Sequence, residues 1–367
     1  MVDPRVKKFA HVLLSYSLGV KQGQLIRLNG NTLSLPLIRE LYAEALAMGA
    51  QPFARISDDD LEEIMLKKGS TRQLTYISPV AKLEIEKIDA MVGIRAAANT
   101  KYLTNIDPAN MALLRKTQFK LMRRFFERAA RGQLNWVATL YPTEAAAQDA
   151  GMSLSDYEDF VYAAYMLDKK DPIAAWKKVS KFNQRIINYL KGKKKIRIVA
   201  PDTDLSYSVA GRKWINCDGK VNFPDGEIYT GPIENSANGY IRYTFPVVYG
   251  GREVEDVRIE FKDGKAIKAT AAKGQDFLTA MLDMDKGARF IGEVAIGTNF
   301  GIDRFTRNIL FDEKIGGTCH IALGEAYPET GGKNVSALHW DMICDLRKGG
   351  FMYADGELFF KDGKFVK

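Results

Sequence analysis

A change of pattern near residue 193 constrains the fold of this chain more than any other feature. Before it, apolar positions with the 3.6-residue period of amphipathic helices alternate with short apolar runs of strand length. After it, the segments are short, strand-like and joined by tight turns. Strands that alternate with helices are typical of βαβ units and a mainly parallel sheet covered on both faces. We therefore expect an N-terminal α/β domain over residues 1–193 and a β-rich α+β domain over residues 194–367.

The pattern also predicts individual elements. Helices are expected at residues 35–48, 108–131 and 275–286, and strands at 24–28, 51–56, 89–94 and 135–140. The run from Ser155 to Glu158 has the form of a capping box, which favours a helix start. Asp263-Gly264 and Asp362-Gly363 each follow an alternating run, which predicts two hairpins in the second domain.

The net charge and the cysteines indicate which binding partners and which cellular compartment to expect. The formal net charge is +8, but outside the run Lys191–Lys195 the cations alternate with acidic residues, and no basic strand is interleaved with aromatics. We therefore expect no nucleic-acid partner. No apolar run approaches the roughly 18 residues that a membrane span needs. The three cysteines form no C-x-x-C pair, and the N-terminal segment lacks the pattern of a secretory signal, so we expect a cytoplasmic protein.

Candidate ligands for a metal lie in the second half. The chain has three histidines, and His11 reads as a surface residue of an amphipathic helix. His339 and Asp341 are two residues apart, so in a strand they project from one face and can share a site. His320 lies in an apolar, strand-like stretch. A core histidine satisfied by its neighbours or a surface polar pair would also explain these residues.

Two glutamates strengthen the metal hypothesis. Glu293 is flanked by apolar residues, and an isolated buried carboxylate must be paired, protonated or bound to a metal. Glu227 follows the turn Pro224-Asp-Gly226, which can present it at the start of a strand. A salt bridge to one of the many cations is the alternative for either residue. Two Glu, two His and one Asp suit Zn²⁺, Co²⁺ or Mn²⁺, and five ligands suit two metals that share a carboxylate.

At these segments the sequence resembles the aminopeptidase T and aminopeptidase S family of metallo-aminopeptidases, to which PepS also belongs. The matching blocks, in the family's order, are Asn222–Pro232, Ile291–Ala295, Cys319–Gly324 with Tyr327, and Ser336–Asp341. The resemblance covers essentially the whole chain, with the specific motifs in the second domain. It implies a homodimer that removes residues from peptides with a free N-terminus, through water activated by two divalent cations.

The resemblance also implies roles for individual residues. The ligands of the two metals are Glu227, Glu293, His320, His339 and Asp341. Tyr327 matches the active-site tyrosine and would donate a hydrogen bond to the developing oxyanion. Independently of the resemblance, Glu325 is a candidate general base because it lies near Tyr327 in the sequence. Another two-metal amide or ester hydrolase, or a non-catalytic metal-binding protein, would use the same ligand set.

Overall fold

The computed structural model describes residues 3–249 and 252–367. The chain divides into two compact units, Met1–Ile173 with Gly219–Phe223, and Ala174–Asp218 with Pro224–Lys367. The boundary at residue 193 that we expect from the sequence falls just after helix α9 (Pro172–Leu190), most of which belongs to the second unit. The limits 1–193 and 194–367 stay a prediction about the domains. Among the described residues, no helix is long and apolar enough to cross a membrane.

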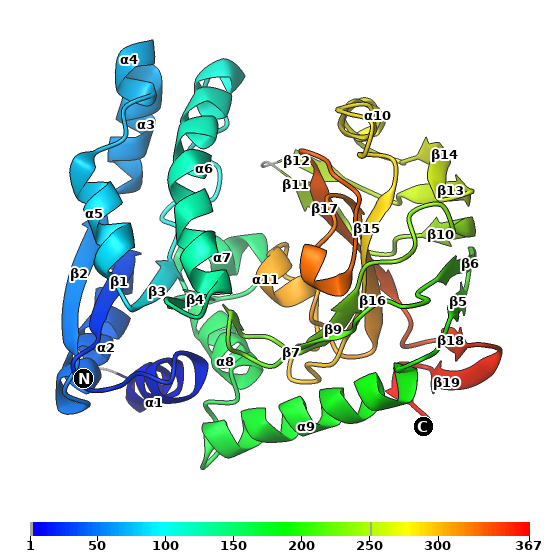
Figure 1. Cartoon of the computed structure of the whole chain (residues 1–367), viewed down its shortest axis with the longest axis horizontal. Coiled ribbons are helices and arrows are strands. Elements are labelled where there is room, and N and C mark those ends of the chain that lie inside the picture. Colours follow the sequence, from blue (N-terminus) through cyan, green and yellow to red (C-terminus); the bar gives the residue numbers. More distant parts are fainter. Residues whose placement is uncertain (1–2, 250–251) are drawn as a thin grey trace. The chain divides into compact units, whose positions relative to one another are not determined.

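The first unit has the expected α/β architecture, with a parallel sheet of order β2-β1-β3-β4-β8. Its strands are β1 (Leu25–Asn31), β2 (Gln51–Ser57), β3 (Ala90–Arg95), β4 (Asn135–Leu140) and β8 (Asn222–Phe223). Its helices are α1 (Pro4–Val12), the π-helix η1 (Leu13–Ser17), the 3₁₀-helix η2 (Thr32–Ser34), α2 (Leu35–Ala47), α3 (Asp59–Lys68), α4 (Thr71–Leu74), α5 (Pro79–Lys87), α6 (Pro108–Ala130), α7 (Glu144–Asp149) and α8 (Leu154–Ala164). Figure 1 shows these elements in blue to green.

The alternation along each strand explains why helices cover both faces of this sheet. Leu25 and Met91 pack with Ile85 of α5 and Phe125 of α6 on one face. The next residue along β1, Ile26, is fully buried on the opposite face, and α2 contacts β1 and β2. A parallel sheet that is buried on both sides is the arrangement expected when helices connect its strands.

The second unit is built from antiparallel sheets. Eight strands pair in the order β14-β13-β10-β6-β5-β18-β19-β20, five in the order β17-β16-β15-β9-β7, and two as β11-β12. The strands are β5 (Lys195–Ala200), β6 (Thr203–Ser208), β7 (Ile215–Cys217), β9 (Glu227–Thr230), β10 (Asn238–Arg242), β11 (Val247–Tyr249), β12 (Arg252–Val254), β13 (Arg258–Lys262), β14 (Lys265–Thr270), β15 (Ile291–Gly297), β16 (Thr318–Gly324), β17 (His339–Asp345), β18 (Phe351–Ala354), β19 (Glu357–Lys361) and β20 (Lys364–Phe365). Short helices α10 (Gln275–Leu282), α11 (Ile309–Asp312) and η3 (Pro328–Thr330) complete it.

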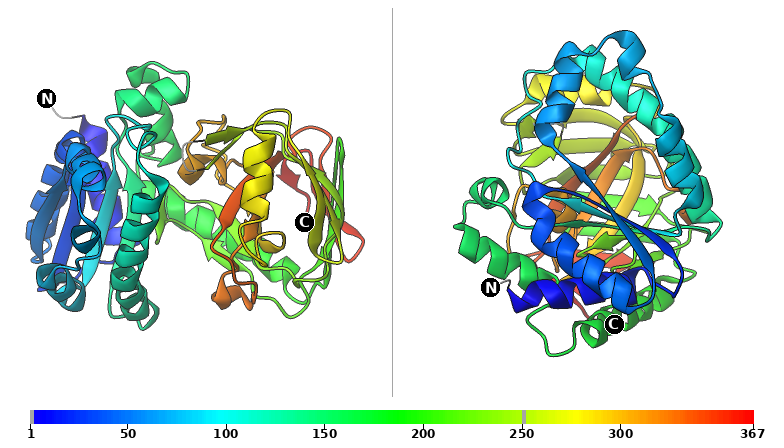
Figure 2. Two further views of the ribbon diagram at one scale, coloured as in Figure 1. Left: turned by 90° about the horizontal axis from the view of Figure 1, so that it is seen from above. Right: turned by 90° about the vertical axis from the view of Figure 1, so that its left-hand side faces the viewer.

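One hydrophobic core joins the two large sheets of this unit. It combines side chains of the eight-stranded sheet, such as Ile196 and Leu205, with side chains of the five-stranded sheet, such as Ile321 and Met342. In Figure 2 the two groups of strands are seen from two further directions. The five-stranded sheet therefore has one face committed to the core, and its other face is available for polar groups.

The local predictions have mixed outcomes. Both hairpins are confirmed, and Asp263-Gly264 and Asp362-Gly363 all have positive φ, as a two-residue type I′ turn requires. The helix start expected at Ser155 is wrong, because Ser153 is the N-cap and accepts a hydrogen bond from the Asp156 N–H. The helix expected to reach residue 286 ends at Leu282.

Candidate metal centre

The five-stranded sheet separates apolar from polar side chains by strand alternation. Ile228, Val294 and Ile321 point into the core, and so do Trp340 and Met342. The residues between them face the other way. The side chains on that second face include Glu227 and Tyr229 of β9, Glu293 and Ala295 of β15, His320 and Ala322 of β16, and His339 and Asp341 of β17. All five predicted ligands therefore lie on one face of the sheet.

Glu293 reaches this face only because β15 contains a bulge. Ile291 pairs with Leu323 and Glu293 pairs with the next residue, Ala322, so Gly292 is an extra residue in β15. Without the bulge, Ile291 and Glu293 would point the same way. With it, Ile291 lies in the core and Glu293 lies among the polar side chains.

Gly292→Ala is expected to disturb this arrangement. A Cβ added at Gly292 would lie 2.1 Å from the Glu325 carbonyl oxygen, which is backbone and cannot turn aside. We expect a destabilisation of about 1–3 kcal/mol, as for other overpacked sites, together with weaker metal binding. Urea unfolding and metal titration measure the two effects. Gly93→Ala, in β3 of the first unit, is the control, because Gly93 has no positive φ and a Cβ there would meet its nearest neighbour, the Val137 carbonyl oxygen, only at 3.9 Å. Unchanged metal affinity in Gly292→Ala would show that the bulge does not aim Glu293.

The side chains form two overlapping groups with Glu293 in both. Glu227, Glu293 and His320 place one ligand atom each within 4.8 Å of the others, and so do Glu293, His339 and Asp341. Glu293 Oε1 lies 3.7 Å from His320 Nε2, whereas Glu293 Oε2 lies 3.2 Å from His339 Nε2. Each oxygen of Glu293 thus serves a different group, which is the geometry of a bridging carboxylate.

Both histidines are held with Nε2 turned toward the carboxylates. His320 Nδ1 lies 2.9 Å from the Glu313 carbonyl oxygen, and His339 Nδ1 lies 2.9 Å from the Glu325 carbonyl oxygen. A carbonyl accepts, so each Nδ1 carries the proton and each Nε2 lone pair is free for a metal when the ring is neutral. Such outer hydrogen bonds are usual for metal-ligating histidines.

The charges of the cluster determine the pKa values of its members. Burial raises the pKa of Glu227 to about 8, and Lys314 and His320 only partly offset this. Burial also acts on Glu293, but His320 and His339 outweigh it and lower the pKa of Glu293 to about 2. Burial would lower the pKa of the histidines, yet the facing carboxylates raise the pKa of each to about 10. A divalent metal must therefore displace protons from Glu227 and the two histidines when it binds.

Metal binding at pH 8 is expected to release about two to three protons, one from each histidine and part of one from Glu227, whose pKa is about 8. The pKa of each ring is about 10 in the folded protein, above the usual 6.5, so both rings are charged at pH 8 and must become neutral to ligate. The release fades as pH rises through 10. Calorimetric titration with Zn²⁺ in buffers of different ionisation enthalpy counts the protons. A heat that is independent of the buffer would contradict the prediction.

Two buried oxygens indicate that these residues suit a cation. Glu227 Oε2 and Asp341 Oδ1 are buried and have no hydrogen-bond partner within the protein. Burying a carboxylate oxygen without a partner is unfavourable by several kcal/mol unless the group is neutral or binds a cation. The donor set contains carboxylate oxygens and imidazole nitrogens, which divalent cations of the zinc, cobalt and manganese type accept. The residues therefore fit a divalent metal.

Sequence reasoning missed two residues of this cluster. Glu313 groups with His320 and Asp341, its ligand atom within 4.8 Å of theirs. Lys314 is fully buried, contacts Glu313 and lies 3.8 Å from Glu227 Oε1. Both belong to the segment that follows α11, where the sequence alone gives no sign of burial for an adjacent Glu-Lys pair.

The remaining predicted residues lie as follows. Tyr327 is 38% exposed, and its ring lies 5.0 Å from the ring of His339. Glu325 is outside the candidate ligand groups found among the described residues, and its Oε2 accepts a hydrogen bond from the Ser336 N–H. His11 is exposed and lies beside Glu44, as expected for a surface histidine.

Comparisons with known proteins give one family and several relatives. The model of the family described as thermophilic metalloprotease (M29) matches residues 2–365. Aminopeptidase 2 of Geobacillus stearothermophilus is 27% identical over 89% of this chain and 84% of its own length. Aminopeptidase T of Thermus thermophilus is 25% identical over 88% of this chain and 85% of its own. The solved structure of wild-type AmpT from Thermus thermophilus superposes with a TM-score of 0.87 at 23% identity, covering 99% of each chain.

Proposed function

Since the chain belongs to the M29 family of thermophilic metalloproteases, we propose that it is an aminopeptidase that uses two divalent cations to remove N-terminal residues from peptides. The family implies a divalent metal, and the names of the relatives support the aminopeptidase activity. The observation that carries the two-metal proposal is Glu293, whose two oxygens face two different histidines. Zn²⁺, Co²⁺ and Mn²⁺ are the proposed ions.

Each side chain has a role in holding the metals. Glu227 and His320 would hold one cation, His339 and Asp341 the other, and Glu293 both. Cations bound in this way supply Lewis acidity, which lowers the pKa of a water molecule and polarises the scissile carbonyl. A cation next to the substrate also gives the neutral α-amine of a peptide a place to bind, and this would restrict cleavage to N-termini.

Two further residues would act on the substrate. Burial and the nearby carboxylates raise the pKa of Tyr327, so its hydroxyl stays protonated and can donate to the oxygen of the scissile carbonyl as charge develops there. Glu313 lies beside His320 and Asp341, so its carboxylate is placed to accept the proton that the attacking water loses. We propose Glu313 rather than Glu325 as the general base because Glu313 lies within the ligand cluster, with Lys314 in contact with its carboxylate, whereas Glu325 is outside the cluster.

Tyr327→Phe is expected to lower kcat by about 10²-fold or more, because a donor to the transition state is lost. Metal content should not change, since the five proposed ligands are carboxylates and imidazoles and all of them remain. Steady-state kinetics and metal analysis of the same preparation measure both. Tyr240→Phe, an exposed tyrosine of β10, is the matched control. A kcat equal to that of the wild type would remove Tyr327 from the mechanism.

The experiment that tests the proposed function is hydrolysis of leucine p-nitroanilide before and after EDTA, with Co²⁺, Zn²⁺ or Mn²⁺ added back. Activity that the chelator removes and a metal restores supports the proposal. Hydrolysis of phosphoesters or simple esters, without hydrolysis of any aminoacyl substrate, would instead identify a different two-metal hydrolase. Turnover that is insensitive to the chelator would contradict the role of the metals.

Assembly and location are further parts of the proposal. We propose a homodimer, supported by large apolar side chains that are exposed on helices of the first unit. They are Leu61, Ile64 and Met65 of α3, Val80 and Leu83 of α5, and Phe119 and Phe126 of α6. Apolar surface of this kind marks interaction sites in folded proteins. Light scattering measures the molar mass of the wild type and of Leu83→Lys in solution, and so tests whether the protein is a dimer. The three free cysteines suit a reducing cytoplasm.

A further inference from the structure

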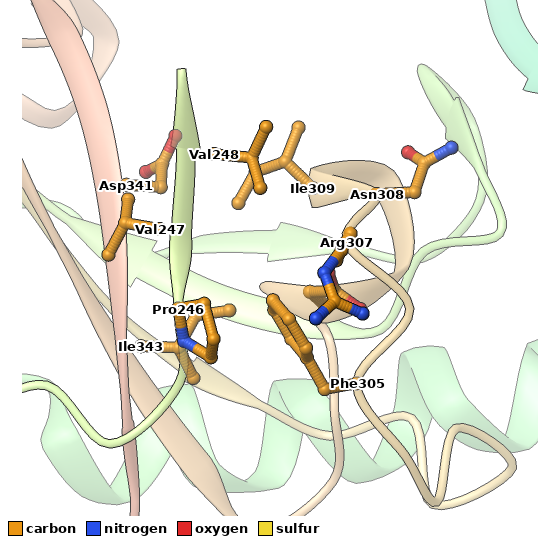
Figure 3. A pocket seen from close by; sticks show the side chains of 10 residues that line it. Pro246, Val247, Val248, Phe305, Arg307, Asn308, Ile309, Asp341 and Ile343 are labelled. Atoms are coloured by element: carbon orange, nitrogen blue, oxygen red, sulfur yellow. The ribbon is translucent and has the colours of Figure 1, made fainter. Parts of the chain in front are cut away.

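A cavity of about 210 Å³ opens in the second unit beside Asp341 (Figure 3). It lies between β11, β17 and the segment that leads into α11. Most of its wall is apolar, formed by Pro246, Val247, Val248, Phe305, Ile309 and Ile343. The volume is below the roughly 300–1,000 Å³ of pockets for drug-sized ligands, so the cavity suits a single side chain.

Three of the four polar side chains of the wall already have partners within the protein, and the fourth, Asp341, belongs to the metal cluster. Asn308 Oδ1 accepts a hydrogen bond from the Leu310 N–H and caps α11. Asp312 Oδ1 accepts from the N–H and the hydroxyl of Thr306. Arg307 lies 3.7 Å from Glu253. The surface of the cavity that lacks a partner is therefore mainly apolar, and an apolar group is the ligand it would bind best.

Asp341 connects this cavity to the metal cluster. Its carboxylate lines the cavity, and its Oδ1 lies 3.6 Å from His339 Nε2. In an aminopeptidase substrate, the α-amine and the scissile carbonyl are both attached to the Cα that carries the first side chain. If the α-amine and the scissile carbonyl lie at the metals, the Cα that joins them lies beside the cluster as well. The first side chain begins at that Cα, so it must occupy a space directly next to the cluster.

We propose that this cavity binds the side chain of the N-terminal residue of the substrate and selects apolar residues such as leucine, methionine and phenylalanine. This inference rests on the proposed aminopeptidase function. Leucyl substrates should exceed alanyl substrates in kcat/KM by about 10-fold or more, because buried methylene groups strengthen binding. Lysyl and arginyl substrates should be poor, since burying a charged group against this mainly apolar wall is unfavourable.

Ile309→Asp is the first test. Ile309 is 39% exposed and is the first residue of α11, where an acidic side chain is compatible with the helix N-terminus, so the variant should fold. We expect kcat/KM for leucine p-nitroanilide to fall about 10-fold or more, with a change below about 3-fold for the alanyl substrate. Ile267→Asp is the matched control, because Ile267 is an exposed isoleucine of β14.

A second variant and a binding measurement keep the test independent of one substitution. Val248→Trp should fill the cavity and reduce leucyl hydrolysis while sparing alanyl hydrolysis. The rise in Tm caused by free leucine should shrink in both variants, and this readout needs no turnover. A leucyl-to-alanyl ratio that stays constant in both variants overturns the inference, and so does a wild-type preference for acidic N-termini. Absence of hydrolysis of every aminoacyl substrate would instead refute the proposed function.

Discussion

Glu293→Gln is expected to lower kcat/KM by about 10³-fold and to reduce the metal content of the protein. Lewis-acid stabilisation by a metal contributes several kcal/mol to a transition state, and about 1.4 kcal/mol corresponds to tenfold in rate. Glutamine keeps the volume of Glu293 but offers one oxygen, and its amide would face one of the two histidine nitrogens. The two ligand groups share Glu293, so its loss affects both.

Kinetics and metal analysis of the dialysed protein measure this prediction. Glu260→Gln removes an exposed carboxylate from the middle of β13 and is the matched control for charge and strand position. We expect the control to keep full activity and metal content. Retention of both metals with wild-type activity in Glu293→Gln would show that Glu293 is not a bridging ligand. Loss of one metal only would assign Glu293 to a single site and would contradict the bridging role.

Lys314→Met is expected to destabilise the protein by about 3–5 kcal/mol, as for other buried ion pairs that lose one partner. Lys314 is fully buried, contacts Glu313 and lies 3.8 Å from Glu227. Burial would lower the pKa of its ammonium group, but Glu227 and Glu313 hold that pKa above its usual value. Methionine fills a similar volume without the charge, so the buried Glu227 and the partly buried Glu313 would lose their fixed counter-ion.

Urea unfolding of chelated protein isolates this effect from metal binding. Lys268→Met, on the exposed face of β14, should change the free energy of unfolding by less than about 0.5 kcal/mol. Metal affinity gives a second readout, because Glu227 Oε1 would no longer be held and Oε2 would be less well aimed at the metal. A Lys314→Met protein as stable as the wild type would show that Lys314 is not the counter-ion of Glu227 and Glu313.

Much of the fold can be predicted from the sequence, because it depends on near neighbours along the chain. Before residue 193, 3.6-residue periods predicted helices and short apolar runs predicted strands β1 to β4 of the parallel sheet, but β8 was not predicted. Asp-Gly pairs predicted two hairpins. Capping was less predictable, since Ser153 and Ser155 both suit a helix start and only the packing of α8 chose Ser153. The boundary between the two units also depends on packing, because α9 is an amphipathic helix that could join either one.

The candidate ligands could be predicted from the chemistry of their side chains and from the family resemblance. Their arrangement in space is visible only in the tertiary structure. The types of side chain, Glu, His and Asp in ordered blocks, predicted a divalent metal site. The sequence did not show that Gly292 forms a bulge, that Glu293 faces both histidines, or that Lys314 is buried beside them with Glu313 partly buried. The reason is that turn and helix preferences act between adjacent residues, whereas the face of a strand and the neighbours of a side chain depend on register between segments far apart in the chain.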